Sequence, residues 1–118
     1  MVDRFMKGVF PILSTPTNRK GQTVLDDLKK QVEWMIENGV DGVGIAIASE
    51  IYKYSEDERD EILKTVVEQS NGRIKVVMNT GAESSNLAIH YSKRAIDLGA
   101  DALMIRPCLL YTSDAADE

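Results

Sequence analysis

The sequence contains one cysteine, one histidine and no long run of apolar residues. The single cysteine, Cys108, excludes a disulfide framework and a thiolate metal site, and His90 alone cannot hold a metal ion. No apolar run reaches the length of a membrane span, and residues 1–7 contain no apolar signal core. We therefore expect a cytoplasmic protein that has no cofactor and does not bind a membrane.

Basic residues are not in excess either. The formal net charge is −5, from 19 acidic and 14 basic residues. Asp114, Asp117 and Glu118 lie among the last five residues, and without them 16 acidic residues face 14 basic ones, a charge of −2. The sequence has no basic patch that would indicate nucleic-acid binding. It also has no Lys/Arg-rich amphipathic helix that would indicate binding to a membrane surface.

The last segment of the chain, residues 108–118, has an unusual sequence. It reads Cys-Leu-Leu-Tyr-Thr-Ser-Asp-Ala-Ala-Asp-Glu and resembles the translation of a transposon-based sequencing adapter. The alternative is a natural acidic tail, since chain termini are often disordered. We interpret residues 1–107 as the protein and residues 108–118 as an adapter-derived tail, which is set aside in the fold prediction.

The rest of the sequence alternates between short apolar runs and amphipathic segments. The apolar runs predict strands near residues 8–13, 40–47, 74–78 and 102–106. The helical spacing of apolar residues predicts helices near residues 23–38, 55–70 and 84–98. Ser55 and Glu58 have the spacing of a capping box at the start of the second helix. The order β-α-β-α-β-α-β predicts a parallel sheet with right-handed crossovers.

Two segments repeat one pattern. Residues 38–45 and 98–105 share Gly, a small residue, Asp, a small residue, an apolar residue, any residue and Ile. The copies lie two βα units apart, and a repeated βα unit favours a barrel or a doubly wound sheet. No Gly-x-Gly-x-x-Gly motif follows the first predicted strand, so a dinucleotide site is not supported. A complete (β/α)8 barrel needs about 250 residues, so this chain matches half of one.

Several motifs follow one another in a familiar order. They are residues 7–16, residues 38–42, the pair Ser49-Glu50, the helix start at 55–59, residues 79–85 and residues 98–102. Together they resemble the dihydrodipicolinate synthase and N-acetylneuraminate lyase family over residues 6–107. The resemblance implies an α/β fold, the N-terminal half of a TIM (β/α)8 barrel truncated after the fourth strand.

The resemblance also implies an activity. Members of this family are homotetramers that condense or cleave 2-keto acids such as pyruvate through a lysine Schiff base. Their lysine lies on the sixth strand and the tyrosine of their proton relay on the fifth, both beyond this chain. We therefore expect no catalytic residue in residues 1–107 and a small-molecule 2-keto acid as the binding partner.

The turn after the second predicted strand departs from the family pattern. A pair of threonines there holds the keto acid's carboxylate in the family, but Ile47 and Ala48 fall on those positions, and Ser49 replaces the next glycine. We expect Ser49 and nearby amides to hold the carboxylate, or the substrate to be bound in another way. Glu50 is expected to brace the turn by accepting amide hydrogens.

Three further residues end predicted strands at the barrel mouth, where substrate-binding residues collect: Thr15, Asn79 and Thr80. A structural loop threonine is an equal interpretation of Thr15. Arg106 ends the last predicted strand and is interpreted as a surface ion-pair residue. Trp34 is predicted to pack between its helix and the barrel.

The sequence leaves three functions open. The first is an aldolase-type lyase, synthase or dehydratase acting on a 2-keto acid. The second is a catalytically inactive barrel fragment. The third is a barrel of another family that binds a phosphorylated substrate, which the missing strands seven and eight would decide.

Overall fold

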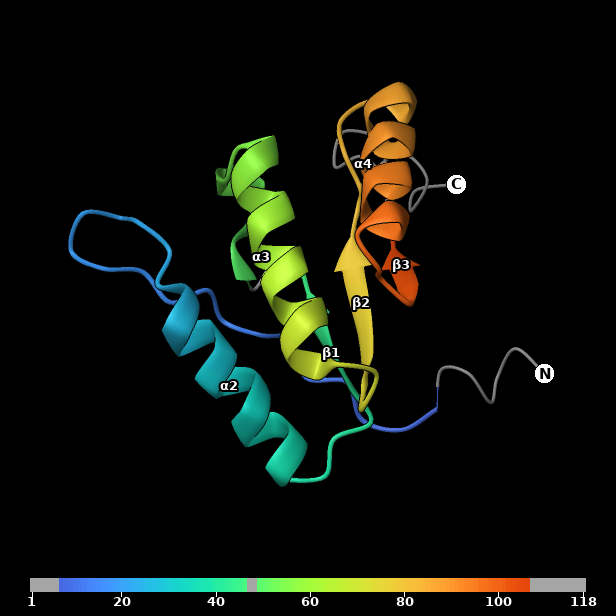
Figure 1. Ribbon diagram of the computed structural model, residues 1–118. Coiled ribbons are helices and arrows are strands. Elements are labelled where there is room, and N and C mark those ends of the chain that lie inside the picture. The colour runs from blue at the N-terminus through green and yellow to red at the C-terminus, as the bar shows by residue number, and fades with distance from the viewer. Residues whose placement is uncertain (1–6, 47–48, 107–118) are drawn as a thin grey trace, which may run out of the picture.

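The computed structural model describes residues 7–46 and 49–106. Its sheet has three parallel strands, which are β1 (Gly42–Ile45), β2 (Lys75–Asn79) and β3 (Ala102–Met104). Its helices are α2 (Leu25–Glu37), the short 3-10 helix η2 (Ile51–Lys53), α3 (Glu56–Ser70) and α4 (Ser85–Asp97). Helix α2 precedes β1, α3 joins β1 to β2, and α4 joins β2 to β3 (Figure 1).

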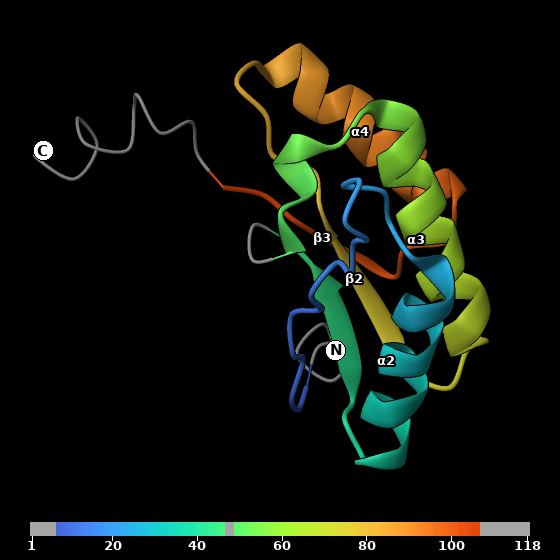
Figure 2. The same ribbon diagram turned by 90° about the vertical axis from the view of Figure 1, so that its left-hand side faces the viewer.

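The strands lie in the order β1-β2-β3, which is their order along the chain. The helices α2, α3 and α4 cover the same face of this sheet (Figure 2). A doubly wound sheet carries helices on both faces, whereas a barrel keeps its strands in sequence order inside one outer ring of helices. Among the two architectures that the repeat favoured, the structure therefore has that of a partial (β/α)8 barrel.

The first predicted strand, near residues 8–13, does not form as a strand. The one bridge in this segment is parallel and joins Ile12 to Gly44, through Gly44 N donating to Pro11 O and Leu13 N donating to Gly44 O, both at 2.8 Å. The next ladder bond toward the N-terminus would need an N–H at residue 11, and proline has none. The segment thus runs beside β1 as an extended chain with a single bridge.

The predicted capping box of α3 is confirmed. The Ser55 hydroxyl accepts a hydrogen bond from Glu58 N at 3.2 Å, and Glu58 Oε1 accepts one from Ser55 N at 3.1 Å. Ser84 caps α4 in the same way by accepting from Leu87 N at 3.1 Å. These local contacts satisfy amide groups that the first turn of a helix otherwise leaves unpaired.

The capping box makes the start of α3 sensitive to acid. The hydrogen bond from the Ser55 amide holds the pKa of the Glu58 carboxyl below its ordinary value. A carboxyl with a lowered pKa contributes stability above its unfolded pKa, near 4.3, and loses it as the pH falls through the folded pKa. We expect Glu58→Gln to flatten the decline in melting temperature between about pH 5 and about pH 3. Ser55→Ala should cost about 1 kcal/mol at neutral pH.

The control for this prediction is Glu61→Gln, which removes a carboxylate from the exposed face of the same helix. Its acid dependence should follow that of the unaltered chain. An acid dependence shared by Glu58→Gln and the unaltered chain would contradict the role of Glu58.

The repeated Gly-x-Asp pattern corresponds to a repeated contact. Asp41 N donates to Val9 O at 3.1 Å, and Asp41 Oδ2 accepts from Val9 N at 2.8 Å. Asp101 does the same with Val76, donating to its carbonyl and accepting from its amide, each at 2.8 Å. Each aspartate therefore binds both backbone groups of a residue on the preceding segment and fixes the point where the next strand begins.

The main core lies between the sheet and its helices. It includes strand residues Val43, Ile45, Val76 and Met78 and helix residues Leu28, Val32, Ile62, Leu63 and Val66. Because side chains alternate along a strand, the positions between these core residues face the opposite side of the sheet, the inside of the partial barrel. On that side Gly42 and Gly44 carry no side chain, and Phe10 and Ile12 lie directly against them.

Candidate functional site

The carboxyl ends of parallel strands share one edge of the sheet, and (β/α) barrels place their sites there. Thr15 follows the segment beside β1, Ser49 follows β1, and Asn79 ends β2 with Thr80 after it. The topology therefore gathers these predicted residues at one edge. Ile47 and Ala48, the two positions that replace the family's threonines, lie outside the described residues.

Ser49 is almost completely buried, with 1% of its surface exposed. Its hydroxyl donates to the carbonyl of Leu13 and accepts from Ala46 N at 3.2 Å. A serine hydroxyl has one hydrogen to donate, and the Leu13 carbonyl takes it. In this arrangement Ser49 cannot also donate to a substrate carboxylate, and instead fixes the turn after β1.

Thr15 completes this connection between the two loops. Its hydroxyl donates to the Ser49 carbonyl at 2.6 Å, across 34 positions of sequence. Thr15 on the first segment thus donates to the second segment, and Ser49 on the second segment donates back to the first. The interpretation of Thr15 as a structural loop residue accounts for this contact.

Glu50 shapes the turn through its backbone. Its φ of 59° lies in the left-handed region, which is uncommon for a residue with a side chain. Its carboxylate pairs with Lys53 Nζ at 3.0 Å, and within the described residues no amide donates to that carboxylate. The pairing with Glu50 raises the pKa of the Lys53 amine, which keeps this lysine protonated.

Asn79 and Thr80 point to different sides of the sheet. Thr80 is fully buried, and its hydroxyl lies 2.8 Å from the Ser92 hydroxyl of α4. Asn79 lies on the face opposite the main core, and its side-chain oxygen accepts from Gly81 N at 2.9 Å. Of the two, the structure directs Asn79 toward the inside of the partial barrel and Thr80 toward the helix layer.

Arg59 is a residue of this edge that belongs to the helix-start motif at 55–59 but was not predicted as a site residue. It comes from the first turns of α3, has 7% of its surface exposed, and donates to the Asn79 carbonyl at 3.1 Å. Its guanidinium carbon lies 4.1 Å from the centre of the Tyr91 ring, a cation–π distance. Burial lowers the pKa of the guanidinium. Arginine is rarely buried, so periodicity gave no sign of this contact, which fixes the end of β2.

Two other predictions concern single residues. Trp34 has 58% of its surface exposed, so the prediction that it packs between helix and barrel is wrong. Arg106 is exposed, and its interpretation as an ion-pair residue stays a prediction. Within residues 7–46 and 49–106, no group of three or more His, Cys, Asp or Glu side chains could hold a metal ion. None of the described helices is long and apolar enough to cross a membrane.

The fold, and the residues at the carboxyl edge of the sheet, together define a class of protein. It is a partial (β/α)8 barrel with polar residues gathered at the carboxyl ends of its strands. A family model described as the dihydrodipicolinate synthetase family matches residues 5–115. The chain belongs to this family, which confirms the resemblance seen in its motifs. The match takes in most of residues 108–118, so an adapter origin for that tail remains a prediction.

Two similar proteins are 4-hydroxy-tetrahydrodipicolinate synthases. The 4-hydroxy-tetrahydrodipicolinate synthase of Methanococcus vannielii is 34% identical over 101 residues, which are 85% of this chain and 35% of the relative. That of Coxiella burnetii is 36% identical over 99 residues, or 83% of this chain and 34% of the relative. This chain thus spans about a third of the length of these relatives.

Solved structures agree with the fold. The chloride inhibited dihydrodipicolinate synthase from Acinetobacter baumannii, complexed with pyruvate, is similar with a TM-score of 0.83 and 33% identity. The similarity covers 85% of this chain and 35% of that protein. The N-terminal half of a TIM barrel, predicted from the sequence, is therefore the fold of this chain.

Proposed function

We propose that this chain is the N-terminal part of a class I aldolase-type enzyme, a lyase, synthase or dehydratase acting on a 2-keto acid such as pyruvate. The observation that carries the proposal is the match of the family model to residues 5–115. The similarity to a synthase complexed with pyruvate supports the choice of substrate class.

We further propose that the whole protein is a homotetramer, which sedimentation of the whole protein would test.

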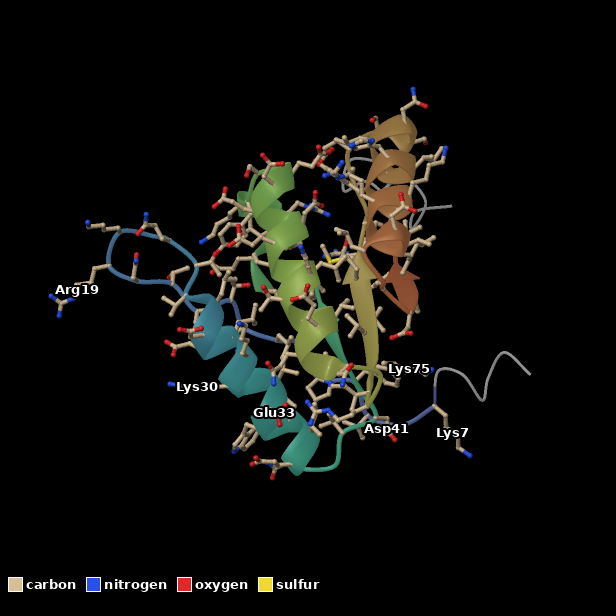
Figure 3. The ribbon with its side chains drawn as sticks, in the orientation of Figure 1. Lys7, Arg19, Lys30, Glu33, Asp41 and Lys75 are labelled. Atoms are coloured by element: carbon tan, nitrogen blue, oxygen red, sulfur yellow. The ribbon has the colours of Figure 1, made fainter. Side chains whose placement is uncertain are left out.

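The chemistry needs a lysine with a neutral amine. Such an amine forms an imine with the keto group, and the keto oxygen leaves as water. The protonated imine withdraws electrons, so that the neighbouring carbon can lose a proton, or a bond to carbon can break there, to give a carbanion. Lys53, the lysine after the turn at Ser49, is held protonated by Glu50. Lys75 begins β2 and therefore lies at the amino edge of the sheet, as does Lys7 (Figure 3). We place the reactive lysine in the part of the barrel that this chain does not span.

The residues of this chain would hold and orient the keto acid. Since Ser49 gives its hydrogen to Leu13, the carboxylate needs other donors. The Asn79 amide nitrogen is one candidate, because no hydrogen-bond partner for it is found in the described part of the chain and it lies on the inner face.

A chimera tests the proposal. Residues 7–106 would replace the matching segment of the Coxiella burnetii synthase, which is 36% identical, so that the relative supplies the rest of the barrel. We expect the chimera, treated with pyruvate and borohydride, to show by mass spectrometry a pyruvyl adduct on one lysine of the supplied part. The 118-residue chain alone should show no adduct, because by this proposal the reactive lysine lies in the supplied part of the barrel.

Two results would contradict the proposal. One is a chimera with the circular dichroism and melting transition of a folded barrel that traps no pyruvate. The other is a stoichiometric adduct on a lysine of the 118-residue chain, which would place the reactive amine in this half of the barrel. The matched control replaces the adduct-bearing lysine of the chimera with arginine, which should abolish trapping and leave the melting transition in place.

A further inference from the structure

The only tryptophan of the chain lies on the surface. Trp34 is 58% exposed, although a buried indole would contribute far more to stability than an exposed one. It borders a shallow groove of about 420 Å³ on the outside of the helix layer, lined by Lys29, Lys30, Glu33, Trp34, Glu37 and Gln69. Tryptophan is enriched among the residues that dominate binding energy at protein interfaces, so an exposed indole beside a groove is a candidate anchor for a contact.

The charges around Trp34 have an order. Lys30, Trp34 and Glu37 are spaced i, i+4, i+7 and so form one stripe along α2. All three are exposed, and in the described part of the chain neither Lys30 nor Glu37 forms an ion pair. Lys30 extends outward from α2, away from the sheet (Figure 3). The stripe therefore presents a positive charge, an indole and a negative charge in sequence.

We infer that this stripe is a self-association surface that binds a second copy of the chain about a two-fold axis. When the two-fold axis is perpendicular to α2, it reverses the direction of α2 in the second copy. Lys30 of each copy then faces Glu37 of the other, and each Trp34 lies in the groove beside the other Trp34. The pattern is complementary to itself, which is what an isologous contact requires.

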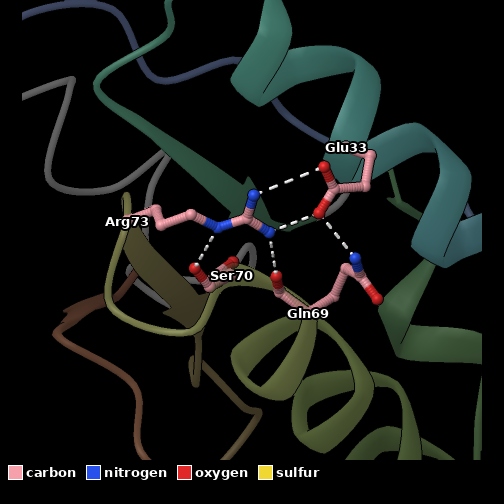
Figure 4. Close-up of polar contacts among 4 residues, drawn as sticks. All are labelled: Glu33, Gln69, Ser70 and Arg73. Carbon is pink, nitrogen blue, oxygen red and sulfur yellow. Dashed lines mark hydrogen bonds and ion pairs between the residues drawn. The ribbon is translucent and has the colours of Figure 1, made fainter.

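The wall of the groove is held in place before any partner binds. Glu33 accepts from Gln69 Nε2 at 2.6 Å and pairs with Arg73 through both carboxylate oxygens (Figure 4). Arg73 also donates to the Ser70 carbonyl at 3.2 Å and to the Gln69 carbonyl at 2.7 Å. These contacts join α2 to the end of α3, so Glu33, Gln69 and Arg73 have little side-chain freedom left to lose on association.

The stripe lies away from the carboxyl edge of the sheet, where the proposed substrate-binding residues gather. Val32, the residue of α2 with no exposed surface, faces the sheet, and the stripe lies on the opposite side of the helix. A contact through one helix face buries less than a standard protein interface, so the association should be weak.

Sedimentation velocity and tryptophan fluorescence, on the 118-residue chain from about 1 µM to about 1 mM, test the inference. We expect a monomer–dimer equilibrium and a blue shift of Trp34 emission along the same concentration curve. Lys30→Glu or Glu37→Lys alone should weaken association by about tenfold or more, because symmetry makes each substitution create two repulsive pairs. Trp34→Ala should abolish the dimer.

The decisive experiment mixes the two single variants, K30E and E37K. In a mixed dimer, the glutamate introduced by K30E in one chain would face the lysine introduced by E37K in the other. The second contact of that dimer would join the unaltered Lys30 to the unaltered Glu37, so that both contacts have opposite charges. We expect the equimolar mixture, and the double variant K30E/E37K by itself, to associate within about threefold of the unaltered chain. Neither substitution touches the core, and circular dichroism of each variant checks that its helices are intact.

Other outcomes would overturn the inference. A chain that stays monomeric up to about 1 mM has no such surface. A dimer whose Trp34 emission does not shift, and which both single variants form equally well, would be joined elsewhere, as by pairing of the β3 edge. Failure of the mixture to recover the association lost in each variant would also contradict the two-fold arrangement. None of these outcomes bears on pyruvate trapping by the chimera.

Discussion

Replacing Ser49 with alanine should lower the free energy of unfolding by about 1–3 kcal/mol, the cost of leaving buried polar groups without partners. The substitution removes the donor to the Leu13 carbonyl and the acceptor for Ala46 N. With 1% of Ser49 exposed, water cannot readily take the place of the hydroxyl. Urea unfolding of the 118-residue chain measures the loss.

Ser14→Ala is the matched control, because it deletes a hydroxyl on the adjoining segment. Ser14 is exposed, and it is its backbone that bonds to Gln31, at 2.9 Å in each direction. This change should stay within about 0.5 kcal/mol of the unaltered chain. Equal stabilities of Ser49→Ala and Ser14→Ala would refute the structural role assigned to Ser49.

The same substitution distinguishes two roles for Ser49 in the chimera. If Ser49 braces the turn, Ser49→Ala should lower the melting temperature, and pyruvate affinity should follow only the fraction of folded protein. If its hydroxyl instead held the substrate carboxylate, pyruvate affinity would fall at temperatures where the variant is fully folded. A titration with pyruvate well below the melting transition separates the two.

Gly42→Ala should destabilise the chain by about 1–3 kcal/mol, as overpacking of a tightly packed site does. A Cβ at this position would lie 2.3 Å from Phe10 Cε2 and 2.7 Å from the Lys75 carbonyl oxygen. Lys75 is the residue of β2 that pairs with Gly42. Relief of the second contact therefore requires the two strands to move apart.

Gly44→Ala, two residues along the same strand, isolates the backbone contribution. A Cβ there would lie 2.6 Å from Ile12 Cδ1, the far end of a flexible side chain, and 4.0 Å from the nearest backbone oxygen. Rotation of Ile12 can relieve that contact, so Gly44→Ala should cost clearly less than Gly42→Ala in urea unfolding. Equal losses would show that the Lys75 carbonyl does not set the limit.

The helices could be predicted from the sequence because their signals are local. The predicted ranges 23–38, 55–70 and 84–98 correspond to α2, α3 and α4 to within two residues at each end. Apolar spacing marks the buried face, and a cap such as Ser55 bonds only three residues along the chain. Neither signal depends on how the rest of the chain folds.

Predictions that depended on neighbours in space were less successful. The strand expected near residues 8–13 is reduced to one bridge at Ile12, because Pro11 cannot donate to β1. Trp34 was predicted to be buried from its residue type, but it lies on the face of α2 opposite Val32. Burial depends on which side of a helix meets the sheet.

By itself, the sequence determined the family, the order of strands and helices, and the edge of the sheet at which polar residues collect. These follow from local periodicity and from motifs, and both can be recognised without knowing which residues are in contact. Tertiary structure alone decided what each polar residue does there. Ser49 bonds to a carbonyl 36 positions away, and Thr15 to one 34 positions away. A hydroxyl can be assigned to substrate or to structure only when its partners in space are known, because it has a single hydrogen to give.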